Sequence, residues 1–221
     1  MTTGNSNVAV GYAALTADTL GDRNVAVGVG ALIAQNFTST TDVYNTAVGY
    51  RSGASVTTGY NNTLIGGLAG DSITTGHSNT TLGVSSLGIN TTGIYNLALG
   101  ISALQSNTTA SYNTAVGSRS LEANTTGTEN TAVGFSSLDA NTTGSYNVAL
   151  GSYALTADTL GARNVAIGRS ALQAQNFTSA TSSYNTAMGY AAGASVTTGT
   201  NNTFVGGLAG DALTTGSNNT A

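Results

Sequence analysis

Few side chains of this sequence could do chemistry. Its 221 residues include one His, no Cys, five Lys or Arg and nine Asp or Glu. Glu122, Glu129 and Asp139 lie in neighbouring stretches of the chain, and a pair of carboxylates could hydrolyse a glycosidic bond. Because we expect no partner Arg, cleft or aromatic subsite beside them, the sequence predicts an exposed stack of Glu122 and Asp139 and no catalytic residue.

The same residues offer little to a metal or a cofactor. Without Cys there is no thiolate ligand, and His77 stands alone, so we expect a solvated corner residue there. Gly66–Asp71 and its copy Gly206–Asp211 are similar to a calcium-binding glycine-rich motif, but each supplies one carboxylate where calcium needs several oxygen ligands. The sequence therefore predicts no metal and no cofactor. Instead, Leu68 and Ile73 are expected to replace a core Leu.

Composition excludes further classes of protein. Only 6% of the residues are charged, against about 25% in an ordinary soluble domain. The net charge is −4, so no basic surface for nucleic acid is expected. Uninterrupted apolar runs are only a few residues long, which argues against a membrane-spanning helix and direct membrane insertion.

A tandem repeat organises the whole chain. The marker Asn-Thr/Val-Ala-Val/Leu-Gly recurs every 17 residues, except that the repeats at 24–44 and 164–184 are four residues longer. Residues 7–81 match residues 147–221 after a shift of 140, which indicates a duplicated block. We expect residues 1–221 to be a single repeat array, cut from a longer one at both ends. The marker Asn residues are 7, 24, 45, 62, 79, 96, 113, 130, 147, 164, 185, 202 and 219.

The spacing of turns and apolar residues predicts the fold. Short segments alternate with period two, as in Asn130–Val133 and Ser136–Ala140, which favours strands over helices. Short strands joined by tight corners at a fixed period predict an all-β, parallel β-solenoid of about 13 coils. Glycine at the fifth repeat position is expected to supply a left-handed corner. These glycines are Gly11, Gly28, Gly49, Gly66, Gly83, Gly100, Gly117, Gly134, Gly151, Gly168, Gly189 and Gly206.

Stacking of coils would place each residue above its own kind. We expect amide ladders of Asn at repeat positions one and twelve, and hydroxyl ladders of Thr at thirteen and fourteen. If positions two and four face the interior, Ala at position three faces outward and forms an interface between copies of the chain. That strip would comprise Ala9, Ala26, Ala47, Ala98, Ala115, Ala132, Ala149, Ala166 and Ala187.

The two four-residue insertions are the best candidates for specific binding, because loops on a rigid scaffold often carry it. Each combines an aromatic residue, expected to be exposed, with hydroxyl and amide groups that could stack on and hydrogen-bond to a sugar. The candidate binding residues are Phe37, Asp42, Tyr44, Phe177 and Tyr184.

The repeats resemble those of a known family. Tyr44–Gly49, Tyr112–Gly117 and Arg163–Gly168 are similar to head repeats of trimeric autotransporter adhesins, and Asn113–Tyr146 is similar to repeats of phage tail fibres. The resemblance implies left-handed, trimeric β-rolls in a cell-surface or virion-tail fibre.

We therefore expect a non-enzymatic, extracellular fibre module: a rigid homotrimeric rod, able to stack end to end. It would space, or contribute to, attachment to a host-surface glycan or matrix protein. The alternatives are an ice-binding β-solenoid and, less in keeping with the sparse acids and bases, a β-helical polysaccharide-degrading enzyme.

Overall fold

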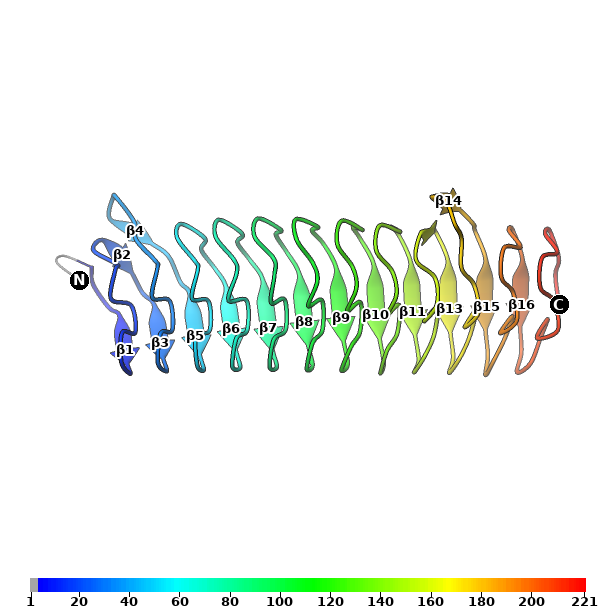
Figure 1. The fold of residues 1–221 in the computed structure, drawn as a ribbon, viewed down its shortest axis with the longest axis horizontal. Coiled ribbons are helices and arrows are strands. Elements are labelled where there is room, and N and C mark those ends of the chain that lie inside the picture. Colours follow the sequence, from blue (N-terminus) through cyan, green and yellow to red (C-terminus); the bar gives the residue numbers. More distant parts are fainter. Residues whose placement is uncertain (1–3) are drawn as a thin grey trace. The chain divides into compact units, whose positions relative to one another are not determined.

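The computed structural model describes residues 4–221, which form a parallel β-solenoid of about 12 turns with 17-residue coils (Figure 1). The chain divides into two compact units, Met1–Ser111 and Tyr112–Ala221. The strands of the first unit are β1 (Val8–Val10), β2 (Gly21–Asp22), β3 (Val25–Val27), β4 (Thr41–Asp42), β5 (Thr46–Val48), β6 (Thr63–Ile65), β7 (Thr80–Leu82) and β8 (Leu97–Leu99). Those of the second are β9 (Thr114–Val116), β10 (Thr131–Val133), β11 (Val148–Leu150), β12 (Gly161–Ala162), β13 (Val165–Ile167), β14 (Thr181–Ser182), β15 (Thr186–Met188) and β16 (Thr203–Val205).

The three-residue strands pair in parallel, and each residue lies beside the same repeat position of the next coil. In the second unit, Ala132 of β10 pairs with Ala115 of β9 and Ala149 of β11. β12 and β14 form a separate two-stranded sheet, as do β2 and β4 in the first unit. The predicted parallel β-solenoid is therefore confirmed at the level of fold.

Glycine at the fifth repeat position makes the corner after each strand. Gly117, Gly134 and Gly168 have φ of 130°, 133° and 127°, a left-handed region that L side chains rarely adopt, and the other glycines of this position lie in the same region. Space is also short there, because a Cβ on Gly134 would lie 2.6 Å from the carbonyl carbon of Gly151 in the next coil. The recurrence of Gly thus has both a conformational and a steric cause.

The strands face the opposite way from the prediction. Alanine at position three points into the coil and is fully buried, whereas positions two and four are partly or wholly exposed. In most coils a buried Leu from the other side already fills the interior, so the small Ala side chain fits at position three; Thr81 is also fully buried at this position. The predicted outward strip is wrong for Ala26, Ala47, Ala98, Ala115, Ala132, Ala149, Ala166 and Ala187; Ala9, in β1, is exposed.

The opposite side of the coil is not a strand. Residues 136–140, expected to be extended, form successive turns in which Ser136 and Leu138 have φ of 49° and 50°. Leu138 is nevertheless fully buried, and backbone hydrogen bonds still join its coil to the next, as from its N–H to the Ala154 carbonyl (3.0 Å). Left-handed residues at positions seven, nine and seventeen recur through the described chain.

At Leu64, a large core side chain on the strand side is matched by glycines on the opposite side of the coil. Leu64 takes the strand position that Ala holds in most other coils, and the neighbouring position-nine residues are Gly53 and Gly70. A Cβ on Gly53 or Gly70 would lie 2.7 or 2.9 Å from a Leu64 methyl carbon, so the glycines make room for this side chain. Ile73 is buried as expected, but Leu68 is only partly buried, so the predicted replacement by Leu68 is wrong and Leu64 fills the core.

The predicted Asn ladders are confirmed. At position one, the Oδ1 of Asn79 accepts from the backbone N–H and Nδ2 of Asn96, at 3.0 and 3.2 Å. Its own Nδ2 donates to Asn62 Oδ1 (3.2 Å) and to the Gly93 carbonyl (2.9 Å). At position twelve, Asn107 Nδ2 donates to Asn90 Oδ1 (2.8 Å). Each amide thus satisfies buried backbone groups of its own coil and the next.

The predicted hydroxyl ladder is found at position thirteen. The Thr74 hydroxyl donates to the Thr91 carbonyl in the next coil at 3.1 Å, and Thr142 donates likewise to Thr159 at 3.0 Å. Threonine at position fourteen is largely exposed, as Thr58, Thr92 and Thr126 show.

Candidate functional site

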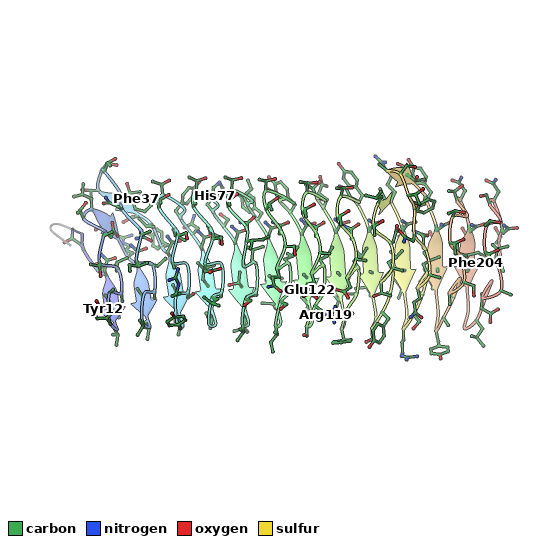
Figure 2. The ribbon with its side chains drawn as sticks, in the orientation of Figure 1. Tyr12, Phe37, His77, Arg119, Glu122 and Phe204 are labelled. Carbon is green, nitrogen blue, oxygen red and sulfur yellow. The ribbon has the colours of Figure 1, made fainter. Side chains whose placement is uncertain are left out.

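Each insertion folds as an extension of its coil. The added residues form β4 in the first unit and β14 in the second, and both stand out from their coils in Figure 1. Phe37 and Phe177, expected to be exposed sugar-stacking residues, are only 8% and 6% exposed, and Figure 2 labels Phe37 at the first extension. The expected exposure of these rings is therefore wrong, because both are buried.

In the coils at and next to the extensions, other residues replace Asn in the amide ladder. At position twelve, Asp158 and Gln175 replace Asn, and both are fully buried. The Asp158 carboxylate accepts from Gln175 Nε2 (2.6 Å) and the Gly161 N–H (2.9 Å). In the preceding coil, Asn141 Oδ1 is buried without a hydrogen-bond partner. Asn107 donates a hydrogen bond to Asn90 at the equivalent place, but the Asp158 carboxylate has no proton to donate to Asn141.

Asp158 makes stability depend on pH. Burial raises the pKa of this carboxyl above its usual range, against the hydrogen bonds from Gln175 and the backbone. Its contribution is therefore fully present below the unfolded pKa of about 4, and is lost as pH rises through the raised folded pKa. We expect the wild type to lose unfolding free energy relative to Asp158→Asn as the pH rises from about 4 toward neutrality. Urea denaturation of both proteins measures this, and parallel pH profiles would contradict it.

The first extension neutralises its own charge. Arg23 forms an ion pair with Asp42 (2.9 Å), donates to the Tyr44 hydroxyl and lies 5.5 Å from the centre of the Tyr44 ring. Two of the three residues proposed for binding here, Asp42 and Tyr44, are exposed but already engaged with Arg23.

The second extension has the same Arg in different surroundings. The Arg163 guanidinium lies between two aromatic rings, 5.2 Å from the centre of Tyr146 and 5.8 Å from that of Tyr184, and donates to the Ser182 hydroxyl. A pocket of about 220 Å³ opens beside it, lined in part by Ser145, Tyr146 and β14. Of the predicted residues, Tyr184 thus belongs to this group. Arg163 and Tyr146 were not among the predicted residues; between the two copies the Arg is the same, and of these two positions only the change from Ser6 to Tyr146 was visible in the sequence.

The carboxylates near the chain's middle have a partner after all. Arg119 donates to Glu122 at 2.6 Å and to Asp139 at 3.2 Å, which corrects the expectation of a pair without Arg (Figure 2). Desolvation raises the pKa of Asp139, and Arg119 opposes it. Glu129 lies apart from this cluster and takes part in no ion pair within residues 4–221. This surface cluster has the arrangement of an ordinary ion-pair network rather than of an acid–base pair.

His77 is not simply solvated. Its ring stacks on Tyr60, with centres 4.5 Å apart, and meets the edge of Tyr95 at 5.7 Å. The described residues contain no group of three or more His, Cys, Asp or Glu placed to hold a metal ion.

Within residues 4–221, no helix is long and apolar enough to cross a membrane. No family model, curated protein or solved structure matches the chain. The second extension is therefore its best candidate site on geometry alone.

Proposed function

We propose that this chain is a non-enzymatic structural module of an extracellular fibre, on a cell surface or a virion tail, that holds an attachment site away from its anchor. The observation that carries the proposal is the repetition of one hydrogen-bonded core in coil after coil, with little surface chemistry beyond the extensions. The similarity of the repeats to those of adhesin heads and tail fibres supports it.

We further propose that the fibre is a homotrimer, associating through the outward strand face instead of the alanines. Apolar side chains recur there at positions four and six: Leu82, Val84 and Ile101 are 52%, 50% and 58% exposed in the first unit. Val205 and Tyr190, in the second, are 62% and 55% exposed. Only a surface with the same period can match such columns over many coils, and a second copy of the chain has that period.

Sedimentation equilibrium tests the proposed association. We expect a mass three times the 21.8 kDa of one chain. The double variant Leu82→Ser, Val84→Ser should weaken the trimer at least tenfold, because it removes apolar area from the interface while changing only exposed side chains. Thr58→Ser, on an exposed corner, is the control. A single-chain mass for the wild type at micromolar concentration would overturn the trimer.

A further inference from the structure

We propose that the pocket at the second extension binds the carboxylate of an acidic sugar, such as a uronic acid, with Arg163 as its anion partner. The inference rests on the proposed role in attachment and names the chemistry of its ligand. It concerns the second unit alone, and no residue at positions four or six, which form the proposed interface, lines this pocket.

The pocket is lined by both polar and apolar residues and carries one positive charge. Ser145, Thr181 and Ser182 line it together with Arg163 and Tyr146. No Asp or Glu is among its lining residues, and within residues 4–221 Arg163 has no carboxylate partner at ion-pair distance. A cation held between two rings, with one of its nitrogen atoms bonded to the Ser182 hydroxyl, is suited to an anion that also carries hydroxyls.

The first extension shows what a closed version of the same site looks like. Residues 140 positions earlier correspond, so Asp22 and Asp42 stand where the second copy has Ala162 and Ser182. In the first extension, Asp42 forms an ion pair with the guanidinium of Arg23, at a distance of 2.9 Å. Ser6 stands where the second copy has Tyr146, so the first site also lacks the second ring. Loss of both carboxylates and gain of a ring convert an internal ion pair into an open anion site.

The size and lining favour a sugar acid over other anions. About 220 Å³ is below the 300–1,000 Å³ of sites for drug-sized ligands, which suits one pyranose ring. A carboxylate matches the planar fork of Arg in bidentate geometry, and a sugar ring can pack on Tyr146 while its hydroxyls meet Ser145 and Thr181. A simple anion would use only the first of these contacts.

Titration of the full chain, followed by NMR, separates these contributions. The probes are methyl β-D-glucuronide and methyl β-D-glucoside, which differ only in carboxylate against hydroxymethyl, with sodium acetate as the third. We expect the glucuronide to shift the Arg163 and Ser182 signals and to bind about tenfold more tightly than either other probe, and less tightly as salt increases.

Variants that copy residues of the first extension provide the controls. Ser182→Asp should restore the internal ion pair and weaken glucuronide binding about tenfold, as should Arg163→Gln, without changing glucoside binding. Because Asp42 is tolerated at the matching place, Ser182→Asp is expected to keep the fold. The triple variant Ser6→Tyr, Asp22→Ala, Asp42→Ser should create a second glucuronide site on the first unit.

Three results would overturn the proposal: equal binding of glucuronide and glucoside, unchanged binding by Ser182→Asp, or acetate binding as tightly as the glucuronide. These outcomes are independent of the proposed fibre role, because sedimentation tests the trimer without any ligand. A trimer that fails to bind glucuronide would refute the pocket alone.

Discussion

Replacing Gly134 by alanine is expected to lower the free energy of unfolding by about 3 kcal/mol or more. Two causes combine at this corner. The φ of 133° is a conformation that L residues rarely adopt, and the new Cβ would lie 2.6 Å from the carbonyl carbon of Gly151. Neither atom can move freely, because the Gly151 N–H is bonded to the Val133 carbonyl at 2.7 Å. Urea denaturation followed by circular dichroism measures the loss.

Two further glycines of the same unit separate strain from collision. Gly206 has a φ of 134°, but its added Cβ would meet nothing closer than the Ala209 Cβ at 3.9 Å. Gly207→Ala would meet nothing within 4 Å, and Gly207 lacks a positive φ. We expect losses in the order Gly134, Gly206, Gly207, with the last within about 0.5 kcal/mol of the wild type. Equal losses at Gly134 and Gly207 would contradict the account.

The repeat and its ladders could be predicted because few other residue types could take the place of Gly or of buried Asn at these positions. Gly at a fixed place in every coil requires a backbone that other residues avoid, and a buried Asn in every coil requires donors and acceptors at a matching spacing. The parallel fold follows, since only stacked coils give both at a period of 17 residues.

The direction of the strands could not be predicted from alternation. Period two separates Thr131 and Val133 from Ala132 but does not say which set is inside. The width of the coil decides it, and that depends on Leu138, whose left-handed backbone no residue type signals. Hydrophobicity alone pointed to the wrong side, because the larger apolar residues remain outside.

The candidate site could be located only in part. The insertions were visible as breaks in the period, but the burial of Phe177 depends on how the extension folds back over its coil. The aromatic partners of Arg163 lie 17 and 21 positions away in the sequence, at Tyr146 and Tyr184. The sequence shows that Ala162 and Ser182 stand where the first copy has Asp22 and Asp42. Only the structure shows that Asp42 forms an ion pair with Arg23, and therefore that its replacement leaves Arg163 without that partner.

Asn79→Ala is the second change from which a large effect is expected, a loss of about 2–5 kcal/mol. The side chain is fully buried, and its Oδ1 accepts from the Asn96 backbone N–H at 3.0 Å. Its Nδ2 donates to the Gly93 carbonyl at 2.9 Å. Alanine would leave these two backbone groups buried without this partner, and an unpaired buried polar group costs free energy.

The isosteric variant Asn79→Asp shows whether hydrogen bonding, rather than volume, carries the effect. It keeps the acceptor for Asn96 but loses the donor to Gly93, so we expect a comparable loss at neutral pH, where the buried carboxylate is also charged. Lowering the pH to about 4, near the ordinary pKa of Asp, should recover part of that loss for Asn79→Asp and none for Asn79→Ala. Asn61→Ser, at an exposed position that holds Ser in the next coil, is the matched control. If Asn61→Ser cost as much as Asn79→Ala, the buried amide could not be the residue that joins one coil to the next.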